Sequence, residues 1–265
     1  MSDSDERELL SVAREAAEAA AAELRRRFGG PAQGVRSKST ATDLVSDADV
    51  AAEYAIRRVL ASRRPGDGIL GEEGGITAGT GTAPAGGGLR WVVDPLDGTI
   101  NYLFGIPAFA VSVACEDESG AVAGVVLDPI REERFEATRS GPPRMNGVAI
   151  EPSGREDIAT AMVATGFAYD SAVRARQGAV VARLLPRVRD IRRVGSAAMD
   201  LCWCACGRYD AYYERGLNPW DVAAGTLIAE RAGLQVRELA AADAVPAGVV
   251  VAPEAFMAEL YDLVE

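Results

Sequence analysis

Residues 91–102 of this chain read WVVDPLDGTINY, an apolar run that stops abruptly at two aspartates. The run is typical of a strand, and open α/β folds place their ligands just beyond such strand ends. The proline stiffens the turn, so that Asp94, the carbonyl of Leu96 and Asp97 can face one ion or ion pair. This stretch therefore predicts a cation site at the end of a strand.

The residues that follow are suited to binding an anion. Gly98 allows the backbone to approach a ligand closely, and its amide and that of Thr99 open a predicted helix over residues 99–105. A phosphate bound there would contact the metal and the start of the helix simultaneously. A lone Asp-Gly pair is also typical of an ordinary turn, so this interpretation depends on further carboxylates meeting the first two.

Other acidic residues also lie at predicted strand ends and helix starts. They are Asp43 and Asp49 in TDLVSDAD, Glu72 and Glu73 in GEEGG, and Asp221 in NPWDVAAG. Taken singly, such residues indicate a solvated acidic pair or a helix cap, and Asp221 has the position of a cap. If they converge, each carboxylate pair at about 4 Å repels by roughly 4 kcal/mol at an effective dielectric of about 20, so a cation is required. Oxygen ligands in a chain without histidine favour magnesium, manganese or calcium over zinc, and magnesium is our prediction.

The composition indicates a globular protein that acts on small molecules. Its 265 residues, 48% of them hydrophobic, suffice for one large domain or two closely packed halves. The formal net charge of −11 argues against nucleic acid and anionic membrane surfaces as partners. No run reaches the roughly 18 apolar residues of a membrane span, and the N-terminus lacks a signal-peptide pattern, so we expect a cytoplasmic protein.

Cysteine and histidine usage narrows the chemistry further. The four cysteines have neither a disulfide framework nor the paired spacing of a zinc site, so we expect buried free thiols at Cys115, Cys202, Cys204 and Cys206. Because histidine is absent, hydrolysis near neutral pH would have to use carboxylates, hydroxyls or a metal-bound water.

The order of predicted elements indicates an α/β protein with mixed α+β layers. Long helices are expected over residues 5–28 and from residue 46 or 47 to 62, whereas residues 74–88 are interpreted as a mobile surface loop. Strands follow in quick succession over residues 108–153, with a tight turn at Asn146-Gly147. From residue 160 strands and helices alternate, so we expect sheets covered by helices in several layers.

The motif WVVDPLDGTINY, together with GEE at 71–73 and PWDVAAG at 219–225, resembles the inositol monophosphatase family of magnesium-dependent, lithium-sensitive phosphomonoesterases. KSTATDLVSDAD, GIPAFAVSVA, ATGFAYD and RRVGSAAMDLCWCACGRYDAYYERG follow the family's order and spacing, so the similarity covers nearly the whole chain. It implies an αβαβα sandwich of the inositol monophosphatase and sugar phosphatase type, usually a homodimer. Residues 1–265 would form a single catalytic unit, with a metal- and phosphate-binding half at 1–150 and an α/β half with substrate-ring contacts at 151–265.

The resemblance also implies a set of metal ligands. Glu72, Asp94 and the Leu96 carbonyl match those of a first magnesium ion, and Asp94, Asp97 and Asp221 those of a second. A third, weaker ion is associated with Glu72. Manganese would be a possible substitute, and lithium would inhibit.

Further site residues are implied in the same way. Thr99, supported by Asp49, matches the residues that orient and deprotonate the attacking water, and Glu72 helps to aim it. The amides of Gly98 and Thr99 match the phosphate cradle. Lys38 and Asp43 belong to the loop that closes over the ions. Glu73 is interpreted as a group that supports the ligands without touching an ion.

The alcohol half of the substrate is implied to lie against a separate group of residues. They are Gly195, Ser196, Ala197 and Glu214, with Asp97 and Asp221 from the metal site. Glu214 would accept hydrogen bonds from ring hydroxyls; alternatively, it is the solvated end of an ordinary strand, DAYYE.

The function implied is hydrolysis of inositol-1-phosphate to myo-inositol and phosphate by attack of a metal-activated water. Alternatives within the superfamily are fructose-1,6-bisphosphatase, histidinol-phosphate phosphatase and 3′-phosphoadenosine nucleotide phosphatase. A bisphosphate would need basic residues near its second phosphate, for which Arg193 and Arg215 are candidates. An alternative of another class is a non-catalytic, metal-binding regulatory protein.

Overall fold

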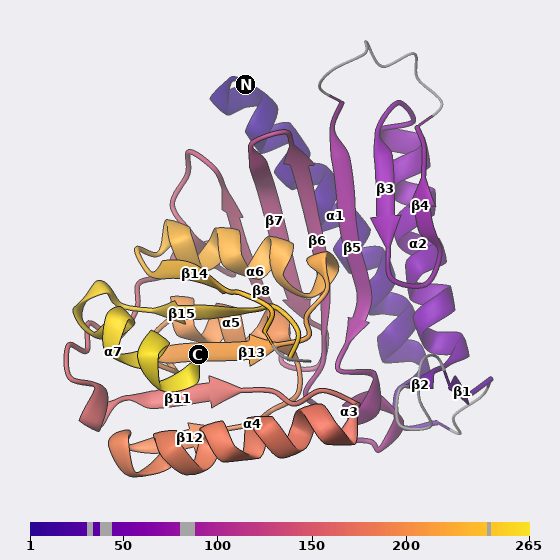
Figure 1. Ribbon diagram of the computed structural model, residues 1–265. Coiled ribbons are helices and arrows are strands. Elements are labelled where there is room, and N and C mark those ends of the chain that lie inside the picture. Colours follow the sequence, from indigo (N-terminus) through magenta and orange to yellow (C-terminus); the bar gives the residue numbers. More distant parts are fainter. Residues whose placement is uncertain (31–33, 38–43, 80–87, 243–244) are drawn as a thin grey trace.

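The computed structural model describes residues 1–30, 34–37, 44–79, 88–242 and 245–265. These residues form five layers, in which two large sheets alternate with three layers of helices (Figure 1). The predicted α/β class with mixed layers is confirmed. Within the described ranges, no helix combines the length and the apolar sequence that crossing a membrane would require.

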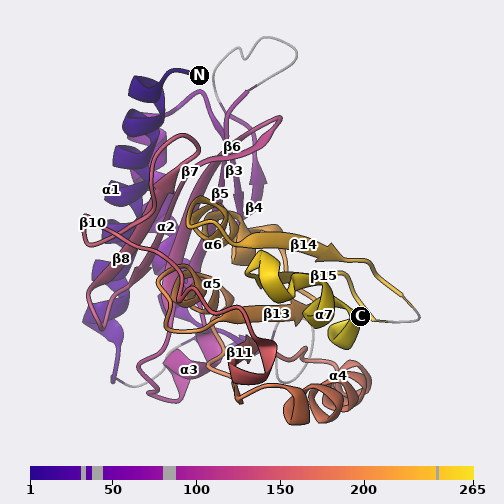
Figure 2. The same cartoon turned by 90° about the vertical axis from the view of Figure 1, so that its left-hand side faces the viewer.

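The first outer layer consists of α1 (Asp3–Arg27) and α2 (Asp47–Arg63), which pack against each other and cover one face of the larger sheet (Figure 2). Alanines make up much of the buried face of α1, so this helix can lie close to the strands beneath it. A capping box at Ser2 starts α1 slightly before the predicted residue, and one at Ser46 starts α2 where it was predicted.

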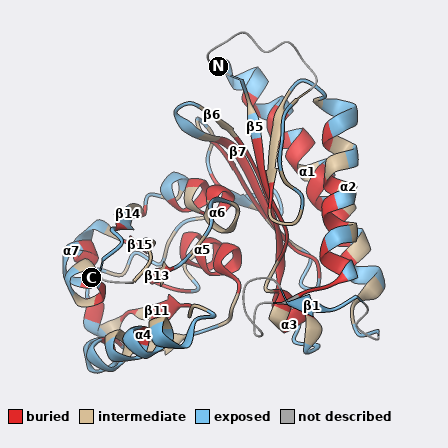
Figure 3. Cartoon of the chain, turned by 45° about the vertical axis from the view of Figure 1, so that its right-hand side comes forward, coloured by how far each residue is buried: buried red, intermediate tan, exposed pale blue. Residues whose placement is uncertain are grey.

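The larger sheet has eight strands in the order β10-β9-β8-β7-β6-β5-β3-β4. Its neighbours pair antiparallel except β3 and β5, which run parallel. Apolar residues on both faces of its central strands are buried, which fits a sheet covered on both sides (Figure 3). The strands are β3 (Gly68–Gly71), β4 (Gly75–Thr77), β5 (Arg90–Asp97), β6 (Ala110–Asp117), β7 (Gly120–Asp128), β8 (Glu133–Thr138), β9 (Arg144–Met145) and β10 (Val148–Ala149).

The middle layer consists of α5 (Ala197–Ala205) and α6 (Pro219–Arg231), which contact both sheets. Every residue of α5 is buried, and the two helices approach closely at Gly225, where a Cβ would lie 2.6 Å from Leu201 Cδ1. The cysteines of this region and Cys115 are free thiols as predicted, although Cys206 is only half-buried.

The smaller sheet has five strands in the order β12-β11-β13-β15-β14. Strand β11 pairs parallel with β12 and β13, whereas β15 pairs antiparallel with β13 and β14. Helices α4 (Ser171–Leu184) and α7 (Glu254–Val264) cover its outer face and bury a separate apolar cluster. The strands are β11 (Met162–Thr165), β12 (Asp190–Arg192), β13 (Ala211–Arg215), β14 (Gln235–Leu239) and β15 (Gly248–Ala252).

Short elements complete the fold. They are the pair β1 (Arg36–Ser37) and β2 (Leu44–Val45), the helix α3 (Thr99–Leu103), and the 3-10 helices Ile158–Thr160 and Leu185–Arg187.

The structure differs from the sequence-based expectation mainly in its strands. Part of the loop expected at 74–88 is strand β4, which pairs with β3, while residues 80–87 lie outside the described ranges. Strand β14 was not predicted, because QVREL has too little apolar alternation to be recognised. The strand expected at 148–153 is only β10, although the predicted Asn146-Gly147 turn does join it to β9.

Candidate active site

Strand β5 ends in the turn that carries the two aspartates. Its pairing with β6 shifts in register between Asp94 and Asp97, so the regular ladder is interrupted there. Asp94 is buried, and its Oδ1 accepts a hydrogen bond from the Leu96 amide, 2.9 Å away. Gly98 follows with a φ of 100°, and a Cβ there would lie only 3.0 Å from the Ala108 carbonyl oxygen. The turn therefore requires glycine at this position.

Thr99 begins α3, and its hydroxyl meets acceptors from two segments. Its Oγ1 lies 2.9 Å from Asp49 Oδ1 and 3.1 Å from the Leu96 carbonyl oxygen. Asp49 is fully buried in the first turn of α2, where its Oδ2 accepts hydrogen bonds from the Ser46 amide (2.9 Å) and hydroxyl (2.7 Å). Both oxygens of the Asp49 carboxylate are thus engaged, one of them by Thr99.

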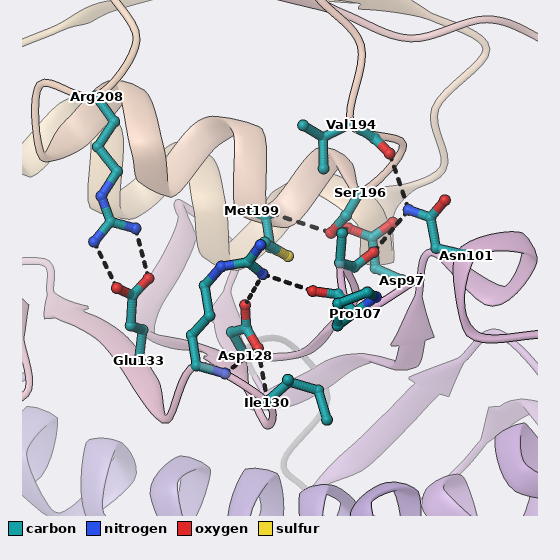
Figure 4. A network of polar contacts seen from close by, with 12 residues as sticks. Asp97, Asn101, Pro107, Asp128, Ile130, Glu133, Val194, Ser196, Met199 and Arg208 are labelled. Carbon is teal, nitrogen blue, oxygen red and sulfur yellow. Dashed lines mark hydrogen bonds and ion pairs between the residues drawn. The ribbon is translucent and has the colours of Figure 1, made fainter. Parts of the chain in front are cut away.

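Asp97 joins the larger sheet to the middle layer of helices (Figure 4). Its Oδ2 accepts hydrogen bonds from the Ser196 hydroxyl and the Ala198 amide, both at 2.7 Å. Burial raises the pKa of Asp97 to about 6, and these two hydrogen bonds act in the opposite direction. The structure therefore brings Asp97 and Ser196 together, but with the serine hydroxyl bound to the aspartate.

Asp221 lies in the first turn of α6. The N-cap residue of α6 is Asn218, and Asp221 Oδ2 accepts a hydrogen bond from its amide at 2.7 Å, so Asp221 completes a capping box without being the cap itself. It also lines the same cavity as Asp94 and Asp97. Burial raises its pKa well above the usual range, and the negative charge of Asp97 raises it further. The Asp221 carboxylate therefore both stabilises the start of α6 and lines the cavity.

The turn at Glu72 and Glu73 is held from behind by α2. The buried carboxylate of Glu53 accepts hydrogen bonds from the amides of Glu73 and Gly74, both at 2.8 Å. Arg57 donates to Glu53 at 2.7 Å and balances its charge. Glu72 lines the cavity, whereas Glu73 is not among the described residues that do so.

These segments surround a cavity of about 440 Å³. It is lined by Glu72, Asp94, Leu96, Asp97, Gly98, Thr99, Ala168, Tyr169, Asp170, Arg193, Gly195, Ala197, Glu214, Arg215, Gly216, Leu217, Asn218, Trp220 and Asp221. Most of the residues that the sequence singled out thus face one space. Lys38 and Asp43 lie outside the described residues.

The acidic residues of the cavity disfavour one another's ionised state. Burial raises the pKa of Asp94 well above its usual range, and the negative charges of Glu72, Asp97 and Asp221 raise it further. Within the described part of the chain, no three acidic or cysteine side chains converge tightly enough to hold an ion as they stand. The donor set nevertheless fits a hard divalent cation, because it consists of oxygen atoms whose mutual repulsion a cation would relieve.

Glu214 and two arginines line the part of the cavity formed by the smaller sheet. Burial raises the pKa of Glu214 to about 7, and the Tyr212 hydroxyl donates a hydrogen bond to its Oε2 at 2.7 Å. Arg215 is buried and donates to the backbone oxygens of Ala240, Pro246 and Glu265, so its guanidinium is already engaged. Arg193 is exposed and lies over the Phe167 ring, 5.9 Å from its centroid.

Four residues near the cavity were not selected from the sequence as site residues: Glu53, Asn101, Asp200 and Tyr212. The Asn101 side chain donates to the carbonyl oxygens of Ala108 (2.7 Å) and Val194 (2.9 Å), the second bond being visible in Figure 4. Asp200 is buried, and neither carboxyl oxygen has a hydrogen-bond partner among the described residues. An aspartate within the apolar sequence AAMDLCWCA was the available signal for it.

Comparisons with known proteins agree over most of the chain. A model of the inositol monophosphatase family matches residues 5–264. The inositol-1-monophosphatase of Mycobacterium leprae is 44% identical over 249 residues, which cover 89% of this chain and 85% of that protein. The Nus factor SuhB of Pseudomonas aeruginosa is 40% identical over 200 residues, with 74% and 73% covered. The solved structure of inositol monophosphatase from Anabaena (Nostoc) has a TM-score of 0.81 and 31% identity, covering 96% of this chain and 94% of that one.

Proposed function

Because this chain belongs to the inositol monophosphatase family, we propose that it is a phosphatase that hydrolyses inositol-1-phosphate to myo-inositol and phosphate. One observation carries the proposal beyond the family: the cavity combines mutually repelling carboxylates with a threonine hydroxyl held by a buried aspartate. Such a site is poorly suited to an anion until cations bind, and well suited to a phosphate dianion afterwards.

The cations are proposed to be magnesium, in two or three sites. Glu72, Asp94 and the Leu96 carbonyl would hold one ion, and Asp94, Asp97 and Asp221 a second, as the oxygen donors of the cavity allow. Bound magnesium would supply positive charge against the phosphate and acidify a water for attack. Lys38 and Asp43 are proposed to belong to a loop that closes over the ions.

Thr99 and Asp49 are proposed to orient the attacking water and to take up its proton. When the Thr99 hydroxyl donates to Asp49 Oδ1, its oxygen keeps lone pairs that can accept a hydrogen bond from a water in the cavity. Asp49 cannot easily turn away, because Ser46 holds its other oxygen. A proton leaving the water can therefore pass to Thr99 Oγ1 as the threonine hydrogen moves toward Asp49.

The two ends of the substrate are proposed to contact different groups of residues. The amides of Gly98 and Thr99, which follow β5 of the larger sheet, would hold the phosphate. Gly195, Ala197 and Glu214 would contact the inositol ring, together with Asp97 and Asp221. Ser196, whose hydroxyl is bound to Asp97, would contribute through that aspartate.

The test is phosphate release from inositol-1-phosphate while magnesium is varied. We expect Asp94→Asn and Thr99→Ala each to lower kcat by about 10²-fold or more, because each removes a group that acts on the reacting atoms. Asp157→Asn, at an exposed 3-10 helix cap, is the matched control and should retain parental activity. Activity within a few-fold of the parent in Asp94→Asn or Thr99→Ala would refute the assigned roles.

The same assay separates the alternative functions. Fructose-1,6-bisphosphate and histidinol phosphate are tested beside inositol-1-phosphate, and preference for either would replace the proposed substrate. Arg215 is poorly placed to bind a second phosphate, since its guanidinium already donates to Ala240 and Pro246. Phosphate release that stays at the background rate at every magnesium concentration would favour a non-catalytic metal-binding protein.

Four further properties are proposed. Lithium should inhibit, and manganese should replace magnesium, as the resemblance to the family implies. The chain should form a homodimer, which sedimentation would test. A cytoplasmic location fits four cysteines that are all free thiols, because a reducing compartment maintains that state.

A further inference from the structure

The direction of the Glu214 carboxylate is fixed by two residues that do not line the cavity. The first is Tyr212, which precedes Glu214 by two positions on β13 and therefore points to the same face of the sheet. Tyr212 is completely buried, and its hydroxyl donates to Glu214 Oε2 at 2.7 Å. One of the two carboxylate oxygens is thus already engaged within the protein.

The second residue is Gly166, which follows β11. This strand pairs parallel with β13, with Thr165 opposite Tyr213, so the next residue lies beside Glu214. A Cβ at Gly166 would lie 1.9 Å from Glu214 Oε2 and 2.1 Å from Oε1. The φ of Gly166 lies outside the left-handed region, so the carboxylate is the obstacle to a larger residue there.

We propose that Tyr212 and Gly166 are positioning residues that aim Glu214 Oε1 at the leaving alcohol and so select phosphomonoesters whose alcohol carries a hydroxyl. This rests on the proposed function. Tyr212 takes up one acceptor site of Oε2, which leaves Oε1 as the less engaged oxygen, and Gly166 gives the carboxylate the space to lie in that orientation. A carboxylate acceptor stabilises the binding of an alcohol that carries a hydrogen-bond donor and does not stabilise the binding of an alcohol without one.

The first test is the variant Tyr212→Phe, which removes the hydroxyl and keeps the ring in the core. We measure kcat/KM for inositol-1-phosphate and for p-nitrophenyl phosphate, whose leaving group has no free hydroxyl. The substrate ratio is kcat/KM for inositol-1-phosphate divided by kcat/KM for p-nitrophenyl phosphate. Loss of one hydrogen bond to a charged group should lower this ratio about tenfold, mainly by raising KM for inositol-1-phosphate.

The neighbouring tyrosine provides a matched control. Tyr213 is also buried but belongs to the apolar cluster under α4 and α7, on the opposite face of β13. In the described part of the chain, its hydroxyl makes no hydrogen bond to Glu214. Tyr213→Phe should therefore keep the parental ratio. An unchanged ratio in Tyr212→Phe, or an equal fall in Tyr213→Phe, would overturn the proposal.

The second test is a double-mutant cycle with Glu214→Ala. Gly166→Ala should lower both the substrate ratio and the thermal midpoint, because its methyl group must displace the carboxylate. In the Glu214→Ala background, neither Gly166→Ala nor Tyr212→Phe should lower the substrate ratio further. Gly166→Ala should then also no longer lower the thermal unfolding midpoint, because the carboxylate it displaces is absent. Additive effects would show that the two residues act independently of Glu214.

Failure of the proposed function gives a different pattern. If the parent releases no phosphate from either substrate, the phosphatase assignment fails and the selection of an alcohol fails with it. If the parent hydrolyses both substrates and the variants keep its ratio, the phosphatase assignment stands and only the positioning role is refuted.

Discussion

Asp97 differs from an ordinary surface aspartate in its response to pH. Its carboxylate is buried, it faces other acids, and it accepts two hydrogen bonds from the segment at Ser196 and Ala198. Burial dominates, so its pKa is raised to about 6 in the folded, metal-free protein, compared with an ordinary value of 3.8. The raised pKa of Asp97 is therefore a measure of the free energy that burying this carboxylate costs.

The consequence for stability has a definite sign. As pH rises above about 4 the unfolded chain loses the Asp97 proton first, while the folded protein keeps it until about pH 6, so the metal-free protein loses stability across this window. Asp97→Asn should remove on the order of 2 kcal/mol of that loss, because its amide oxygen can still accept the two hydrogen bonds. The measurement is thermal or urea unfolding with chelator present, from pH 4.5 to 7.

Asp94 and Asp221, whose pKa values are also raised, remain in this variant. The slope of stability against pH should therefore become shallower in Asp97→Asn without vanishing. Identical slopes in the variant and the parent would contradict the role assigned to burial at Asp97.

At the scale of elements, α3 is too short to be stable by itself. It has five residues and is held by side-chain contacts on both of its sides. Thr99 connects it to α2 through Asp49, and Asn101 connects it to Ala108 and Val194. Contacts with residues that are far away in the sequence thus hold the short helix in place.

Replacing Asn101 by aspartate should break these connections while keeping the side-chain shape. The carboxylate cannot donate, and it would face two carbonyl oxygens in a buried place, so we expect a loss of about 2–4 kcal/mol in unfolding free energy. Asn146→Asp is the control, because its lost amide contact with Glu132 is exposed to solvent. Equal losses in the two variants, measured by urea unfolding, would argue against the Asn101 connection.

For the whole molecule, the cavity draws its groups from both sheets and from the helices between them. Magnesium should therefore stabilise the entire fold, by about 2.7 kcal/mol at a concentration 100 times its dissociation constant. The gain should be larger at pH 8 than at pH 5, because at the lower pH the raised pKa values keep carboxylates of the site protonated.

Thermal unfolding with and without magnesium at the two pH values measures this gain. Asp221→Asn is the informative variant, since its amide oxygen can still complete the capping box of α6 while the charge offered to a cation is lost. A gain as large in this variant as in the parent would place the ion elsewhere.

The sequence predicted the parts of this molecule whose signal is local. Acids at strand ends, the two long N-terminal helices and the α/β class follow from periodicity, caps and turn residues. The contact of Asp97 with Ser196 spans 99 residues, and that of Gly166 with Glu214 depends on the parallel pairing of β11 and β13. No periodicity encodes either, and β14 was missed because its five residues carry little alternation.

The close contact of Gly225 with Leu201 holds α5 and α6 against each other within the middle layer. On one side of that layer lie the acids of the larger sheet, and on the other lies Glu214 of the smaller one. The packed pair of helices therefore lies between the strands that carry these two groups of acidic residues. A methyl group added at Gly225 would overlap the Leu201 side chain, so glycine at this position is what allows the two helices to pack this closely.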